Sequence, residues 1–203
     1  MNKYLISIFS FLAFGASAQA IQSIDEAGQL LSKVSGVSVR PFSTRDFGRE
    51  RYSKARSVLV PQNRAQDILN KVRKNLSPMF IAFVGTTNNL ESKNSKDFEI
   101  VVAEGKNQFD IVKVAATNAV NYEKSTDQII SKLKKWDSEY GIDIWQAETD
   151  TIQLSLKKQP KDIKKFSQEV YEFCPDIVDQ GVGSVEALEL EIVKSKAIYL
   201  WWD

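Results

Sequence analysis

The sequence predicts an α+β fold: a single domain with a mixed β-sheet and helices packed on at least one face. Apolar residues recur at helical spacing in some segments, and alternate with polar residues or run continuously over strand length in others. The order helix, strand, strand, helix occurs twice, around residues 62–116 and 126–173. The chain is 43% hydrophobic and of single-domain size, so it can bury a core.

The first 20 residues, MNKYLISIFSFLAFGASAQA, have the pattern of a secretory signal peptide. Lys3 supplies a positive charge, residues 4–14 are almost entirely apolar, and residues 18–20 give a small-x-small cleavage site. The apolar run is too short for the ~20 residues that a membrane span needs. A buried or amphipathic N-terminal helix is the alternative. We therefore expect an exported protein, periplasmic or secreted after cleavage, with no transmembrane segment.

The mature chain is expected to comprise an N-terminal extension, residues 21–59, and a domain, residues 60–203. In the extension, Ser23 is placed to cap a helix over residues 23–34. Residues 37–42 predict a strand, weakened by a proline. Residues 42–56 are polar and predict no element.

The domain begins with a helix at Pro61, because proline suits a first turn and apolar residues follow at helical spacing up to Pro78. The elements expected after it are a buried strand at 79–85, a polar loop at 86–96, a partner strand at 98–104, a short helix at 108–116, a helix capped by Ser125 or Thr126 and ended by Gly141, strands at 142–147 and 151–157, a helix opened by Pro160, a helix capped by Ser184, and a final strand at 197–203.

Residues 172–183, EFCPDIVDQGVG, lie between two helical patterns and raise the question of a turn or a site. Pro175 cannot continue a helix, and two glycines permit backbone angles that other residues avoid. The polar side chains, Gln180 among them, can bond freed backbone groups. A well-formed turn therefore explains the segment without a ligand.

The alternative is a carboxylate cluster. Asp176 and Asp179 would join Asp150, from the turn between two strands, and Asp203, at the end of the chain. Carboxylates brought together bind hard cations or act as an acid/base pair. Their spacing matches no specific metal motif, so we predict no metal and no cofactor.

Two further groups are candidate ligand contacts. Asn121 and Tyr122 lie in the polar segment TNAVNY, which is either a capping turn or the rim of a ligand site. Trp201 and Trp202 close the last strand, and because alternate strand residues face opposite ways, one should be core and the other on a face. A tryptophan beside a carboxylate, as Trp202 is beside Asp203, suits a binding surface.

The composition excludes several kinds of chemistry. The chain has no histidine, which removes Ser-His-Asp and Cys-His catalysis and histidine-based zinc sites. Its one cysteine, Cys174, can form no intramolecular disulfide, and we expect it to be buried and inert. Without Lys3, the 27 basic side chains become 26, which equals the 26 acidic ones. This balance argues against nucleic acid as a partner.

Several segments together resemble a bacterial family known as domain of unknown function 4253. They are QFDIVKVAATNAVNY, GIDIWQAETDTIQLSL, YEFCPDIVDQGVGSVEALELEI and the final YLWWD. The resemblance runs from about Val60 to Asp203. It implies that residues 172–183 and the last strand belong to the shared core of one domain, and it implies no particular activity.

Two hypotheses follow for the function. The first is a module that binds an unknown protein or small molecule, including an immunity-type partner of a bacterial toxin, since no catalytic motif is present. A small ligand would use Asn121, Tyr122 and Trp202. The second is a carboxylate-based hydrolase, with or without a metal, built on the four aspartates.

Overall fold

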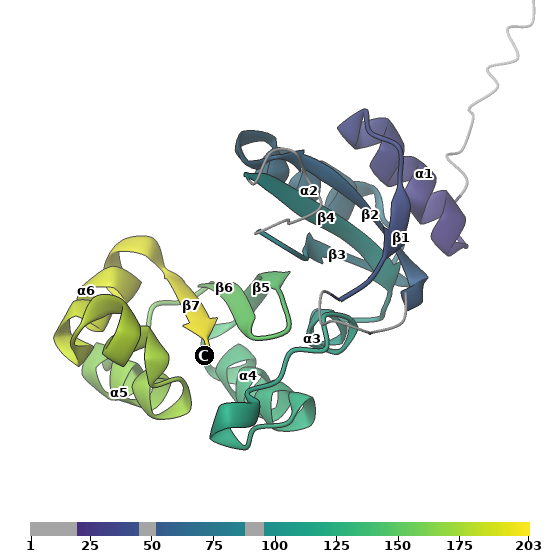
Figure 1. The fold of residues 1–203 in the computed structure, drawn as a ribbon. Helices are drawn as coiled ribbons and strands as arrows, with labels where there is room; N and C mark the ends of the chain where they lie inside the picture. The colour runs from purple at the N-terminus through teal and green to yellow at the C-terminus, as the bar shows by residue number, and fades with distance from the viewer. Residues whose placement is uncertain (1–19, 45–51, 88–95) are drawn as a thin grey trace, which may run out of the picture.

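The computed structural model describes residues 20–44, 52–87 and 96–203, and shows an α+β domain with one mixed sheet (Figure 1). Its seven described strands lie in the order β1-β2-β4-β3-β5-β6-β7. Every neighbouring pair is antiparallel except β3 and β5, which are parallel. The predicted fold class is confirmed. Of the predicted signal peptide, only Ala20 lies within the described residues, and most of the predicted loop at 86–96 lies outside them.

The elements follow the predicted order, with one additional strand, β2. The strands are β1 (Arg40–Phe42), β2 (Tyr52–Pro61), β3 (Phe80–Val84), β4 (Asp97–Glu104), β5 (Ile142–Ala147), β6 (Thr151–Leu156) and β7 (Ala197–Trp201). The helices are α1 (Ile24–Ser35), α2 (Gln62–Asn75), α3 (Phe109–Val114), α4 (Thr126–Tyr140), α5 (Ile163–Phe173) and α6 (Val185–Ser195), with a short 3-10 helix η1 (Val120–Tyr122) and a π-helical turn η2 (Ile177–Val182). None of the helices in the described residues is both long and apolar enough to cross a membrane.

Side-chain caps start three of the six α-helices where the sequence predicts them. Ser23, Ser125 and Ser184 each accept a hydrogen bond from the backbone N–H three residues further on, at the starts of α1, α4 and α6. The helix expected to open at Pro160 is α5, which begins at Ile163 instead. Asp162 caps that helix through the same kind of bond, so the chain turns into the helix only after Asp162.

Strand β2 begins within residues 42–56, for which the sequence predicted no element; residues 45–51 of that segment lie outside the described residues. It pairs with both β1 and β4 and so lies inside the sheet. The sequence did not predict this strand because polar residues interrupt its apolar pattern. Ser57 of β2 and Glu99 of β4 are both buried and bond to each other at 2.7 Å. Arg40 of β1 also donates to the Glu99 carboxylate, at 2.8 Å. A buried polar group is tolerated when it is hydrogen-bonded, and then it breaks the apolar pattern that marks a strand.

Helices cover both faces of the sheet (Figure 1). Helices α1 and α2 pack on one face of β2, β3 and β4, where Leu31 and Leu69 are fully buried. Helices α3 to α6 pack with the other face and with β5 to β7, around Trp136. The ring of Trp136 meets those of Phe166 and Phe173 edge to face, with centroids 5.6 and 5.5 Å apart. The prediction that helices cover at least one face of the sheet is therefore confirmed, and both faces are covered.

The parallel pair β3 and β5 joins two parts of the sheet. Its register consists of one pair of residues, Val84 and Gln146. Away from that pair a side chain bridges the strands: Arg73 of α2 donates to the carbonyl oxygens of Ala82, at 2.8 Å, and Ile144, at 2.6 Å. Because parallel strands end at the same edge, the residues that follow β3 and β5 lie next to each other. In open α/β sheets this edge is where ligands commonly bind.

Candidate functional site

Residues 172–183 form a tight turn around the buried carboxylate of Asp176. Its Oδ1 accepts hydrogen bonds from the Tyr122 hydroxyl at 2.6 Å and from the Gln180 amide at 3.0 Å. Its Oδ2 accepts one from the backbone N–H of Asp203 at 2.9 Å. Asp176 is only 3% exposed. Four predicted site residues therefore meet here, and their contacts hold the turn against the end of the chain.

The electrostatics of Asp176 fit this structural role. Burial acts to raise its pKa, but the hydrogen bonds from Tyr122, Asp203 and Gln180 outweigh burial and hold the pKa below the ordinary aspartate value. The bond to Asp176, together with burial, raises the pKa of Tyr122 to about 12. Asp176 is thus ionised at neutral pH with both oxygens engaged, so the turn interpretation accounts for it.

Asp179 lies apart from this group. It is exposed and accepts a hydrogen bond from the Tyr171 hydroxyl at 3.1 Å. Within residues 20–44, 52–87 and 96–203, no three carboxylate or thiol groups gather in a way that could hold a metal ion. The four aspartates therefore do not form one cluster in the described structure.

Cys174 is buried, as predicted, and its thiol bonds to the edge of β7. The sulfur donates to the Trp201 carbonyl at 2.9 Å and accepts from the Trp201 N–H at 3.2 Å. Burial raises the pKa of the thiol to about 11. A thiol in this state is neutral at physiological pH and is a poor nucleophile.

A polar hollow of about 200 Å³ lies beside the turn between β5 and β6. It is lined by Asn118, Ala119, Val120, Asn121, Thr149, Asp150 and Trp202. Three of these, Asn121, Asp150 and Trp202, are predicted site residues. They come from three separate segments, which the fold brings together: the loop after α3, the β5–β6 turn and the end of the chain. We call this set the polar hollow.

Hydrogen bonds fix the wall of the polar hollow. The backbone N–H of Asn118 donates to the Thr149 carbonyl at 2.9 Å, and the Thr117 hydroxyl donates to the Glu148 carbonyl at 2.6 Å. The loop is bounded by two non-glycine residues in the left-handed region, Ala116 (φ 54°) and Glu123 (φ 53°). Such strained residues persist only where their surroundings hold them, and they concentrate at functional sites.

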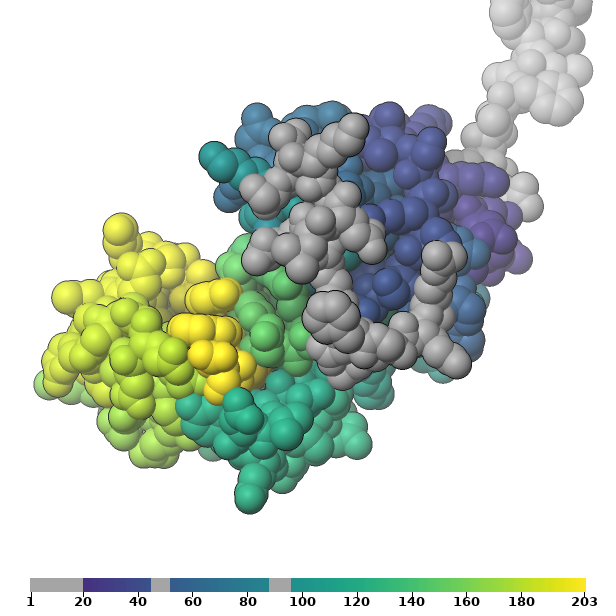
Figure 2. All heavy atoms as spheres, in the orientation of Figure 1, coloured from purple at the N-terminus to yellow at the C-terminus, as the bar shows by residue number. Residues whose placement is uncertain are grey.

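One of the two tryptophans is in the core, as predicted, but it is Trp202, which the sequence had suggested for a binding surface. Trp202 is 4% exposed, donates from its indole to the Phe173 carbonyl at 3.3 Å, and meets the Phe173 ring edge to face. Trp201 is half-buried on the opposite side of β7, which also carries the exposed Tyr199. Figure 2 shows β7 at the surface next to β5 and β6, with no helix over it in that view. Trp202 is thus a core residue that also lines the polar hollow.

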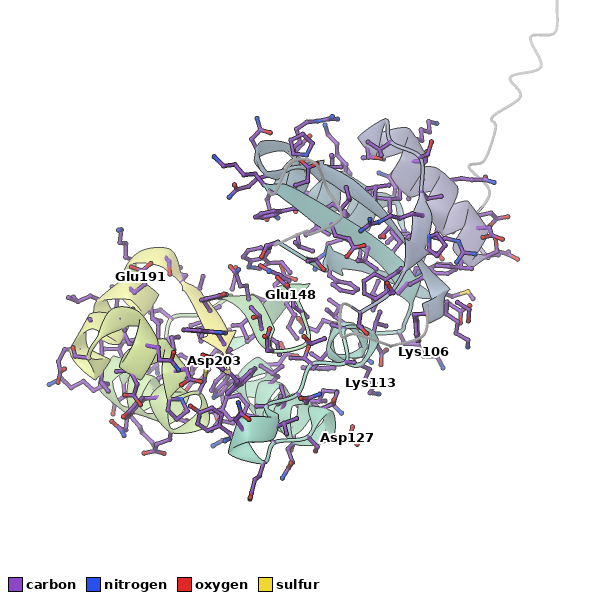
Figure 3. All side chains as sticks on the ribbon, viewed as in Figure 1. Lys106, Lys113, Asp127, Glu148, Glu191 and Asp203 are labelled. Carbon is purple, nitrogen blue, oxygen red and sulfur yellow. The ribbon has the colours of Figure 1, made fainter. Side chains whose placement is uncertain are left out.

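Glu148 is a candidate that the sequence analysis did not identify. It follows β5, at the edge where the parallel strands end (Figure 3). Its Oε1 accepts from the Thr87 N–H at 3.1 Å, the Thr87 hydroxyl at 2.9 Å and the Gln146 amide at 2.8 Å. Oε2 receives no hydrogen bond from any described residue. Burial, with a smaller contribution from the charge of Asp150, raises the pKa of Glu148 despite these bonds.

Glu148 also lines a second, smaller hollow of about 30 Å³, which shares Thr149 with the polar hollow. The edge after β3 and β5 therefore offers two adjoining recesses with a carboxylate in each, Glu148 and Asp150. The neighbouring Asp150 was a predicted candidate because it lies in the same turn. Glu148 could have been found only from the pairing of β3 with β5, since its partner Thr87 is 61 residues away in the chain.

Comparison with known proteins gives one family and no individual relative. Neither the curated proteins nor the solved structures contain a match to the chain. The model of the family described as Domain of unknown function (DUF4253) matches residues 99–203, more than half of the chain. The match includes the polar hollow, Glu148 and the Asp176 turn. Residues 60–98, which the sequence resemblance also covers, lie outside it. The chain belongs to the DUF4253 family.

Proposed function

We propose that the protein is a binding module that takes a small polar ligand in the polar hollow. The observation that supports this most directly is the hollow itself, whose lining includes Asn118, Asn121, Thr149 and Asp150. Two amides, a hydroxyl and a carboxylate provide both donors and acceptors. The bonds that fix the loop keep these groups in place before a ligand arrives, which lowers the entropy lost on binding.

The lining also indicates the chemistry of the ligand. At about 200 Å³ the hollow is smaller than sites for drug-sized molecules, so the ligand has few heavy atoms. No lysine or arginine is among the described lining residues, and Asp150 carries a negative charge. A ligand with hydroxyl or ammonium groups matches this environment, whereas an anion would be repelled by Asp150.

Replacing Asn121 with alanine is expected to weaken ligand binding about three- to tenfold, since it removes one or two hydrogen bonds. The fold should remain intact because Asn121 is exposed. Calorimetric titration with a panel of small polyols and amines, such as glucose, glycerol and putrescine, measures this. Asn75→Ala, an exposed asparagine at the end of α2, is the matched control. If Asn121→Ala and Asn75→Ala change the affinity of every bound ligand equally, the ligand binds outside the polar hollow.

A second candidate function is carboxylate catalysis of hydrolysis, now centred on Glu148 with Asp150. Its support is the second oxygen of Glu148, which no described residue engages, and the burial that raises the pKa of this carboxyl above the ordinary glutamate value. Glu148→Gln would then abolish turnover of chromogenic ester or glycoside substrates, and Asp179→Asn would leave it unchanged. If the unmodified protein turns over none of these substrates, the hydrolase candidate is wrong and ligand binding is the function that remains.

We also propose that the chain is exported. Signal-peptide cleavage after Ala20 would leave Ile21 at the new N-terminus, two residues before the cap of α1. The carbonyl of Ile21 accepts a hydrogen bond from Ser77 at 2.7 Å, so the mature chain would begin at a residue that contacts the domain. N-terminal sequencing of the periplasmic or secreted protein should begin IQSIDE, and an uncleaved cytoplasmic protein would contradict export.

A further inference from the structure

A larger hollow, of about 740 Å³, shares no lining residue with the polar hollow. It is lined by Tyr52, Lys54, Pro78, Met79, Glu104, Gly105, Lys106, Asp110, Lys113 and Val114. These residues come from the start of β2, the approach to β3, the turn after β4, and α3. The volume is in the range of pockets that enclose small organic molecules.

The floor of this hollow is apolar. Met79 is 55% exposed and Tyr52 is 37% exposed, and Pro78 and Val114 adjoin them. Exposed apolar side chains gathered in one recess commonly mark a binding surface. The floor is held in place by the backbone, because the N–H of Gly105 donates to the Met79 carbonyl at 2.9 Å. This bond joins the approach to β3 to the turn after β4, two of the segments that line the recess.

The rim carries three lysines and two acidic residues. Lys54 pairs with Glu104 at 3.2 Å, and Lys113 pairs with Asp110 at 3.4 Å. Asp110 is also engaged by two backbone N–H groups of the turn before α3. Lys106 is exposed, and its ammonium contacts no described acidic side chain. Figure 3 shows Lys106 and Lys113 on the same side of the molecule, at α3. The Lys106 ammonium at the rim is thus available to pair with an anionic ligand.

We propose that this hollow binds a free single-chain aliphatic carboxylate, with its chain on Tyr52 and Met79 and its head at Lys106. A chain without a charged head would leave the lysine unmatched, and an anion without a chain would leave the apolar floor in water. An amphiphile with one negative charge satisfies both. This site stands independently of the small polar ligand proposed above.

Calorimetric titration of the mature protein with hexanoate, octanoate and decanoate tests the site, with 1-octanol as the neutral match for octanoate. Each added methylene should tighten binding about three- to fourfold, as expected when the chain enters an apolar recess. Lys106→Glu should weaken octanoate binding about three- to tenfold and leave 1-octanol unchanged. Met79→Asp should weaken all four probes.

Lys165→Glu makes the same change of charge on α5, away from the hollow, and should leave all affinities as they are. The inference is wrong if decanoate fails to bind at millimolar concentration, if affinity does not rise with chain length, or if octanoate and 1-octanol respond alike to Lys106→Glu. Binding to anionic vesicles without binding of decanoate would identify a membrane surface instead and would also overturn it. Because Met79 and Lys106 are exposed, their variants should fold normally.

Discussion

Replacing Trp202 with alanine is expected to lower the free energy of unfolding by about 3–5 kcal/mol, the usual cost of removing a large buried aromatic side chain. Trp202 is 4% exposed, and it contacts Phe173 both through its ring, with centroids 5.5 Å apart, and through its indole N–H. Alanine would leave a cavity and an unsatisfied carbonyl at Phe173. Urea denaturation followed by circular dichroism measures the change.

Trp201→Ala is the matched control, because it removes the same side chain one residue earlier, on the half-buried side of β7. Its cost should be less than half as large. If both variants lose the same stability, the core position of Trp202 is not what stabilises this end of the chain. The comparison also matters for function: a loss of ligand binding in Trp202→Ala would reflect the fold, whereas a loss in Asn121→Ala would reflect contact.

Asp176→Asn is expected to cost about 2–4 kcal/mol, since hydrogen bonds to a charged group contribute about 1.5–3 kcal/mol each and an amide cannot accept on both sides. One of the donors from Tyr122, Gln180 and Asp203 would then face another donor. The same substitution at Asp179, which is exposed and whose side chain accepts a hydrogen bond from Tyr171, should change the unfolding free energy by less than about 0.5 kcal/mol.

The effect of Asp176 should depend on pH in a defined direction. Its pKa is lowered in the folded protein, so its stabilising contribution is complete above the unfolded value of about 4. The contribution is lost as the pH falls through the lower, folded pKa. The difference between the unmodified protein and Asp176→Asn should therefore be constant from pH 6 to 8 and shrink below pH 4. A difference that grows on acidification would contradict the ionised state of Asp176.

Local features could be predicted from the sequence because their determinants lie within a few residues. Helix α4 is an example: the cap at Ser125, the buried face that includes Leu133 and Trp136, and the ending at Gly141 all lie in one short segment. The turn around Pro175 is another. In each, the chemistry of neighbouring residues is sufficient to fix the backbone.

The candidate site could be predicted only in part, because it depends on contacts between distant segments. Asp176 and Tyr122 were both identified as candidates, yet their bond joins residues 54 positions apart. Glu148 gains its significance from Thr87 and from the parallel pairing of β3 with β5, neither of which leaves a local pattern. Asn121, Asp150 and Trp202 were identified for separate reasons, and only the fold places them around one hollow.

The thiol of Cys174 has a consequence for how copies of this protein behave at high concentration. Among the described strands, β7 is at the edge of the sheet, and in such a strand every second residue turns its backbone groups outward, where another chain could pair with them. The Cys174 sulfur occupies the outward groups of Trp201, and the Ser195 hydroxyl occupies those of Ala197. Only Tyr199 keeps outward N–H and C=O groups that no described residue engages. Two small side chains, Cys174 and Ser195, therefore leave few backbone groups of β7 available for pairing with a further strand.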